Sequence, residues 1–289
     1  MLTRVFYQKT ALHLPSAYFC YMKKWSTALL GLLLLSCHNE MADKSNRTLT
    51  KEEMPLHVKA LLARTKQNPD SAALRLQLVD AFDSLGAYRE AMAQMDSLLQ
   101  KDSLNYGLWY RKALLQEDTK DTAGALRSYR YAIRIYPAPD ALLAAANLLA
   151  EKKDANALLL CKQVNALHLG REYSAHTYFI SGVYYARTGD KQKAIESFNN
   201  CLYNNLNYME AYMEKGFLYY DDKKINEALK VFQSVVMLKN TYADGYYWLA
   251  KCQESIHNTN EAIDNYQKAV TLDPKLKEAS DALKRLGAK

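Results

Sequence analysis

The chain has 289 residues, of which only ten are Gly and six are Pro, a composition that disfavours turn-rich all-β, collagen-like and Gly-rich disordered chains. Its formal net charge is +7, but residues 1–36 hold four basic residues and no acidic one, which leaves the remainder at +3 with the two signs interspersed. So small an excess gives no electrostatic reason to expect nucleic-acid binding.

The first 36 residues have the features of an export signal. The cationic segment Met22-Lys23-Lys24 precedes an apolar run from Trp25 to Ser36, which is 12 residues long. A helix that crosses a bilayer needs roughly 20 residues, so this run fits the core of a secretory signal. We expect residues 1–36 to lie outside the folded domain. Translation then begins either at Met1, with a long leader, or at Met22.

The apolar run ends in Leu34-Leu35-Ser36-Cys37, which resembles the lipobox of bacterial lipoproteins. The resemblance implies that a diacylglyceryl group is attached to Cys37 and that Cys37 becomes the first residue of a membrane-anchored mature protein. In such lipoproteins an Asp after the Cys commonly signals retention at the inner membrane. Here His38 follows, so the resemblance favours an exported protein held at the outer membrane. The alternative is an ordinary signal peptide that ends near a Cys.

The next two segments lead into the main part of the chain. Residues 37–53 are polar and charged without apolar periodicity, which predicts a flexible tether. Residues 54–71 predict a lead-in helix with Leu61 and Leu62 turned inward, followed by a turn at Asn68-Pro69-Asp70.

From residue 72 onward the chain repeats itself every 34 residues. Each clear copy has a small residue in its first half, a second small residue in its second half, and in most copies an aromatic residue four positions later. The three sets are Ala113, Gly182, Gly216 and Ala250; Ala91, Ala125, Ala194, Ala228 and Ala262; and Tyr129, Phe198, Phe232 and Tyr266. Small residues allow two helices to approach closely, and no single copy can bury its apolar face alone.

This pattern resembles the tetratricopeptide repeat family, in which each copy is a pair of antiparallel helices, A and B. The resemblance implies an all-α, right-handed superhelical solenoid with six repeats over 72–276 and a capping helix at 277–289. The copy near 138–171 is degenerate, with Cys161 in place of the aromatic residue and extra residues at 172–174, so we expect a local change of curvature there.

The sequence offers no catalytic or metal-binding constellation. The six His residues are scattered, and neither H-E-x-x-H, G-x-S-x-G nor C-x-x-C occurs. We therefore expect no cofactor and no metal. Cys161, Cys201 and Cys252 stand at packing positions and are interpreted as small buried hydrophobic residues; a disulfide in an exported protein is the alternative.

In the family that the pattern resembles, helix A lines an inner groove that receives peptides or partner helices. The candidate groove residues are Tyr110, Phe179, Val183, Met213, Phe217, Tyr220 and Tyr247. We expect the central ones to form an exposed apolar strip, with Asp80, Asp83 and Glu254 making the two ends acidic. Burial of the strip by closure of the superhelix is the alternative.

These features predict a membrane-anchored protein–protein interaction scaffold of the bacterial cell envelope, without enzymatic activity. Its expected partners are a protein or peptide and, through the lipid anchor, a membrane. Two other functions stay open. One is glycan binding in nutrient uptake, because Tyr-rich surfaces can stack on sugars, and the other is a scaffold that only associates with itself.

Overall fold

The computed structural model describes residue 50 and residues 52–288. The expected signal region, Cys37 and most of the expected tether lie outside these described residues. Within them the chain forms fourteen helices and no strand, so the predicted all-α fold is confirmed. None of the described helices combines the length and apolar character needed to cross a membrane.

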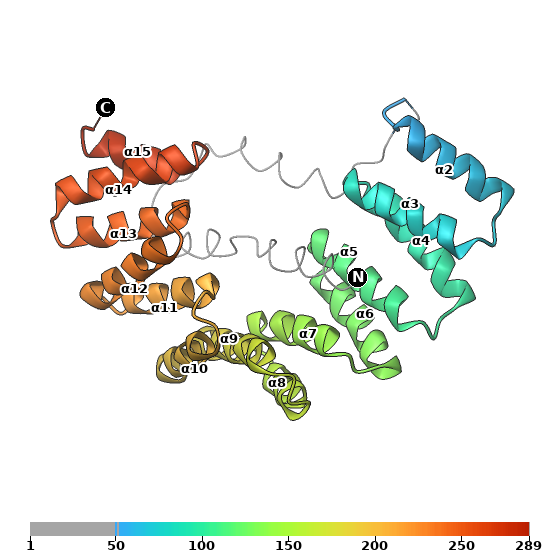
Figure 1. Cartoon of the computed structure of the whole chain (residues 1–289), viewed down its shortest axis with the longest axis horizontal. Coiled ribbons are helices and arrows are strands. Elements are labelled where there is room, and N and C mark those ends of the chain that lie inside the picture. The colour runs from blue at the N-terminus through green and yellow to red at the C-terminus, as the bar shows by residue number, and fades with distance from the viewer. Residues whose placement is uncertain (1–49, 51, 289) are drawn as a thin grey trace, which may run out of the picture. The chain divides into compact units, whose positions relative to one another are not determined.

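Six helix pairs follow a lead-in helix and precede a terminal one (Figure 1). The helices are α2 (Leu56–Gln67), α3 (Ala72–Ser84), α4 (Tyr88–Lys101), α5 (Tyr106–Asp118), α6 (Thr122–Ile135), α7 (Pro139–Glu151), α8 (Asn156–Ala166), α9 (Arg171–Thr188), α10 (Lys191–Asn204), α11 (Met209–Asp221), α12 (Ile225–Leu238), α13 (Ala243–Ser255), α14 (Thr259–Leu272) and α15 (Lys277–Arg285). The odd-numbered helices from α3 to α13 are helices A, and each is followed by its helix B.

Several of these helices begin at a polar side chain that caps them. Asn105 accepts a hydrogen bond from the backbone N–H of Leu108, and Asp121 accepts one from Gly124. Asp190 does the same for Lys193 at the start of α10. Such caps satisfy backbone donors that have no partner in the first turn of a helix, and each typically contributes about 1 kcal/mol.

The spacing of small and aromatic residues produces the close approach between helices A and B that the repeats require. A Cβ atom added to Gly182 would lie 2.5 Å from the ring of Phe198, and one added to Gly216 would lie 2.5 Å from the ring of Phe232. Both rings are fully buried. The second small residue of each clear copy is fully buried as well, so the repeat pattern describes the packing inside each pair.

The degenerate third pair is organised differently from its neighbours. The thiol of Cys161 is buried at the position that an aromatic ring fills elsewhere. The extra residues at 172–174 belong to the first turn of α9, which at 18 residues is the longest described helix. α9 packs on α7 as well as on α8 and α10. The expected change of curvature at this copy stays a prediction.

The two ends of the array are closed by single helices. α15 packs on α14 through the buried Ala279 and Ala282, as expected for a capping helix. α2 packs on α3, but its fully buried apolar residue is Val58, while Leu61 and Leu62 are only partly buried.

Candidate partner-binding surface

The structure buries part of the predicted groove strip. The exposed fractions of Phe179, Val183 and Met213 are only 5%, 1% and 6%. The prediction that these three residues are exposed is therefore wrong. Phe179 and Val183 lie in a core cluster that also draws residues from α7, α8 and α10. Met213 lies in a second cluster, with residues of α12 and α13. Phe179 also stacks on Tyr208, with the ring centroids 4.9 Å apart.

The remaining four candidates are half-buried, and three of them meet at one place. The rings of Phe217 and Tyr220, on α11, lie 4.7 and 5.5 Å from the ring of Trp248, on α13. The ring of Tyr247 lies 5.6 Å from the same ring. We call Phe217, Tyr220, Tyr247 and Trp248 the aromatic cluster. It forms a half-buried aromatic surface across two consecutive helices A.

A lysine completes this surface. The ammonium nitrogen of Lys251 lies 4.5 Å from the ring centroid of Trp248, and 5.4 and 5.7 Å from those of Tyr220 and Tyr247. Burial lowers the pKa of Lys251, although the nearby carboxylate of Glu254 opposes the shift. The negative faces of the rings compensate in part for the water that the ammonium has lost.

Tyr110, the fourth half-buried candidate, lies apart from the aromatic cluster. Its ring stacks on Tyr106 at 5.7 Å and lies 5.7 Å from the buried ring of Tyr129. The Tyr129 hydroxyl donates to Glu117 on the preceding helix A. Burial raises the pKa of Glu117, and the hydrogen bond from Tyr129 opposes that rise.

The acidic ends of the predicted groove are partly neutralised by basic residues. Asp80 pairs with Arg111 of α5, the next helix A. One carboxylate oxygen of Glu254 accepts hydrogen bonds from Arg285 Nη2 and from the hydroxyl of Tyr266, both at 2.9 Å. The bond from Arg285 is the main reason that the pKa of Glu254 lies below its usual value. Because their charges are paired, Asp80 and Glu254 would attract a basic ligand only weakly.

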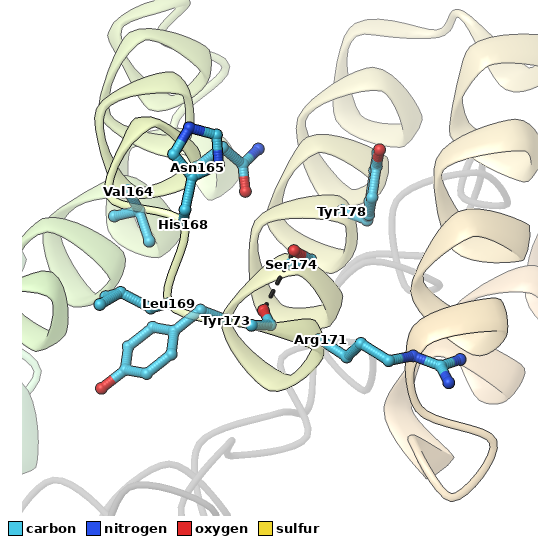
Figure 2. A pocket seen from close by; sticks show the side chains of 9 residues that line it. Val164, Asn165, His168, Leu169, Arg171, Tyr173, Ser174 and Tyr178 are labelled. Carbon is cyan, nitrogen blue, oxygen red and sulfur yellow. Dashed lines mark hydrogen bonds between the residues drawn. The ribbon is translucent and has the colours of Figure 1, made fainter.

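An open hollow lies at the connection between α8 and α9 (Figure 2). Its volume is about 460 Å³, and Val164 and Leu169 are among its apolar lining residues. Arg171 points away from the centre in Figure 2 and donates to the backbone carbonyl of Tyr203. His168 stands in a left-handed backbone conformation at the turn. Both apolar and polar side chains line this hollow, and among the described residues that line it Arg171 is the only Lys, Arg, Asp or Glu.

The described residues hold no group of three or more His, Cys, Asp or Glu side chains able to bind a metal ion. Cys161, Cys201 and Cys252 are free thiols and are buried, which confirms the interpretation of them as small core residues. Burial raises the pKa of the Cys161 and Cys252 thiols to about 12. Thiols that stay protonated and inaccessible are poor nucleophiles.

Sequence reasoning missed two residues of this region. Trp248, at the centre of the aromatic cluster, directly follows Tyr247, and a Trp on helix A beside a groove position was the available signal. Arg187 joins three consecutive helices A, because its guanidinium donates to Glu151 of α7 at 2.8 Å and to Glu214 of α11 at 3.2 Å. No sequence motif predicts these contacts, because Glu151 and Glu214 are 36 and 27 residues away from Arg187 along the chain.

Comparison with known families identifies the repeats. Profiles of the tetratricopeptide repeat match residues 76–138, 175–208 and 243–276. These matches fall on the first, second, fourth and sixth helix pairs. The chain therefore contains tetratricopeptide repeats, and proteins built from them are protein-interaction scaffolds that bind protein or peptide partners.

Solved structures with the same fold support this assignment. A tetratricopeptide repeat protein from Parabacteroides merdae ATCC 43184 is 18% identical, with a TM-score of 0.66 over 82% of this chain and 93% of that one. PilW, described as a widely conserved type IV pilus biogenesis factor, is 18% identical, with a TM-score of 0.62 over 73% of this chain and 98% of its own. At such identities the likeness concerns the fold alone, and it confirms the predicted solenoid.

One curated relative also aligns with most of the chain. The DnaJ homolog subfamily C member 7 homolog of Dictyostelium discoideum is 23% identical over 292 aligned residues. The alignment includes 92% of this chain but 49% of the relative, so the chain spans about half the length of that protein.

Proposed function

We propose that this chain of tetratricopeptide repeats is a non-enzymatic adaptor that binds a partner peptide or helix on the aromatic cluster of α11 and α13. The observation that supports this proposal is the convergence of Phe217, Tyr220 and Tyr247 on Trp248. Half-buried aromatic side chains that stay partly accessible on a folded surface favour binding, because they bury a large area while losing few rotamers.

The second part of the proposal concerns location. A lipid on Cys37 anchors the adaptor in the bacterial cell envelope; the order of Met22-Lys23-Lys24, the apolar run and Leu34-Leu35-Ser36-Cys37 supports the anchor. His38, in place of an Asp after the Cys, favours the outer membrane. PilW, a similar fold, is described as a type IV pilus biogenesis factor. A role in envelope assembly is compatible with that likeness but rests on fold alone.

The binding surface can be tested by crosslinking the full-length protein in its own membranes and recovering the partner. Tyr220 and Tyr247 are changed to Ala together, because Trp248 also stacks on the core residue Phe232 and its loss would disturb folding. Truncating central aromatic contacts typically costs about 2–4 kcal/mol of binding free energy, so recovery of the partner should fall more than tenfold.

The matched control removes two other tyrosines that are exposed at the ends of helices B, by combining Tyr136→Ala with Tyr203→Ala. This control should recover the partner as well as the wild type does. Equal recovery by a folded Tyr220→Ala, Tyr247→Ala protein would show that the partner binds elsewhere.

A further inference from the structure

Lysines that lie over aromatic rings recur along this solenoid, and most of them also have a hydrogen-bond acceptor or stand in open solvent. Lys112 bonds to Asp96 at 2.6 Å, Lys193 contacts Asp190 at 2.7 Å, and Lys215 bonds to Asn199 at 2.7 Å. Lys239 and Lys268 each lie over a single ring, and both are exposed.

Lys251 differs from all of these. It is half-buried and contacts three rings, but no oxygen among the described residues accepts a hydrogen bond from its ammonium group. An ammonium group carries three donors, and partial burial limits the water that can serve them. The lysine is therefore a preplaced, partly desolvated cation.

Glu254, the acid best placed to pair with Lys251, is bound by other residues. Glu254 lies one helical turn further along α13, where an acid would ordinarily pair with a lysine. Its carboxylate is bound instead by Arg285 of α15 and by the hydroxyl of Tyr266, both at 2.9 Å. Tyr220 and Ser255, the neighbouring hydroxyls, lie 3.3 Å from each other, and Ser255 donates to the backbone carbonyl of Lys251. These polar groups are thus engaged with one another, and the carboxylate of Asp221 acts on Lys251 through its charge without a hydrogen bond between the two.

We propose that Lys251 binds the carboxylate of an Asp or Glu side chain in the partner peptide, while a neighbouring apolar side chain of that peptide lies on Trp248 and Phe217. This inference rests on the proposed function and specifies the chemistry of the same surface. A hydrogen bond to an ion is about twice as strong as a neutral one, and little further water must be removed from Lys251 when it forms.

The geometry favours an acidic side chain over a phosphate group or a chain terminus. Phosphates and terminal carboxylates are usually held by several donors, from an arginine fork or consecutive backbone amides. At this position one ammonium group lies among rings, and the guanidinium of Arg285, whose charge acts on Lys251, is already paired with Glu254. A single point charge beside an apolar surface suits one carboxylate next to one apolar residue.

Peptide selection tests the proposal directly. A phage library of random 12-residue peptides, displayed without a free carboxyl terminus, is selected on the full-length protein in detergent. The wild type is compared with Lys251→Met, and with Lys268→Met as a matched control that removes an exposed lysine lying over the ring of Tyr246. Folding of all three proteins is checked by circular dichroism.

We expect the wild type and Lys268→Met to enrich peptides that have Asp or Glu beside Leu, Phe or Trp. The Lys251→Met protein should still select the apolar residue but lose the preference for an acid. A synthetic copy of the most enriched peptide should bind the wild type about tenfold more weakly when its acid is changed to Gln or Asn, and that change should have no effect on Lys251→Met.

The outcomes separate this inference from the proposed function. Peptides enriched in apolar residues without an acid, or an acid preference that persists in Lys251→Met, would overturn the role of Lys251 and leave the adaptor function standing. If no peptide is enriched on the wild type, both the role of Lys251 and the binding of peptides by this surface are wrong.

Discussion

Arg187 of α9 and Glu151 of α7 form a bidentate ion pair, with both N···O distances at 2.8 Å. The same guanidinium reaches Glu214 of α11 at 3.2 Å through two further bonds. One side chain therefore connects three consecutive helices A, beginning with that of the degenerate third pair. In a solenoid each repeat is stabilised mainly by its neighbours, so this contact spans two repeat interfaces at once.

Removing that guanidinium should destabilise the array. The Arg187→Met change leaves the side chain of Glu214, which is only 11% exposed, without its cation. Breaking a buried pair costs about 3–5 kcal/mol. Glu151 is 40% exposed, so we expect about 2–3 kcal/mol, measured as a lower urea midpoint in circular dichroism. Lys284→Met, which removes an exposed pair with Asp281, should change stability by less than about 0.5 kcal/mol. Equal midpoints for the two variants would contradict the role of Arg187.

The close approach of Gly216 to the ring of Phe232 predicts that a larger residue at this position destabilises the fold. In Gly216→Ala the added methyl group meets the ring of Phe232, which is fully buried and cannot move away without repacking. Such overpacking costs about 1–3 kcal/mol, more than the gain in helix propensity of about 1 kcal/mol. Gly107 is a suitable control, because its nearest atom is 3.4 Å away, so Gly107→Ala should be neutral or stabilising. A more stable Gly216→Ala protein would show that the interface is looser than described.

The buried thiols of Cys161 and Cys252 should not react with alkylating reagents in the folded protein. Burial raises the pKa of Cys161 and Cys252 to about 12, so at pH 8 both stay protonated and covered by side chains. We expect iodoacetamide to leave them unmodified in the folded protein and to modify both in urea, as measured by peptide mass spectrometry. Rapid labelling of either thiol without denaturant would indicate local opening of its repeat. A disulfide between them would appear as a loss of labelling in urea that reductant restores.

The pairs of helices could be predicted because their cause is local. The distance from Gly182 to Phe198 along the chain is the same as that from Gly216 to Phe232, and in both pairs the small residue faces the ring. One sequence is enough to detect such a period, and the alternation of helices A and B follows from it.

The exposure of the groove residues depends on how closely one repeat packs on the next, and not on the packing inside a single helix pair. Phe179 and Val183 are buried in a cluster that includes residues of the preceding pair, α7 and α8, as well as α10 of their own pair. The aromatic cluster likewise joins Trp248 to Tyr220 across two repeats. Small differences in the rotation between repeats decide these contacts, and no residue spacing within one repeat reports that rotation.

The ion pair between Glu254 and Arg285 predicts a pH dependence at the capping helix. The guanidinium lowers the pKa of Glu254, so this pair stabilises the fold above the ordinary pKa of the carboxyl group and is lost as pH falls through the lowered value. Glu254 and Arg285 are partly exposed, and we expect the contribution to stay below about 1 kcal/mol. Thermal melts of the wild type and Arg285→Met should differ at pH 7 and converge as the pH falls through the lowered pKa of Glu254. A difference that is constant with pH would mean that Arg285 acts through packing alone.

The proposed lipid anchor on Cys37 can be tested by substitution, with Cys20 as the control position. Changing Cys37 to Ser removes the thiol that would be acylated, whereas Cys20→Ser removes another N-terminal thiol that precedes Met22. Acyl chains hold a protein in a bilayer through burial of their methylene groups, an interaction that salt does not reverse and detergent does. The wild type and Cys20→Ser should therefore remain in the membrane pellet through a high-salt wash and dissolve in detergent, while Cys37→Ser should be released. Mass spectrometry of the mature wild-type protein should find a lipid-modified Cys37 as its first residue. Retention of Cys37→Ser in the membrane fraction, or an unmodified Cys37 in the wild type, would refute the anchor and leave the partner-binding surface to be judged by its own experiments.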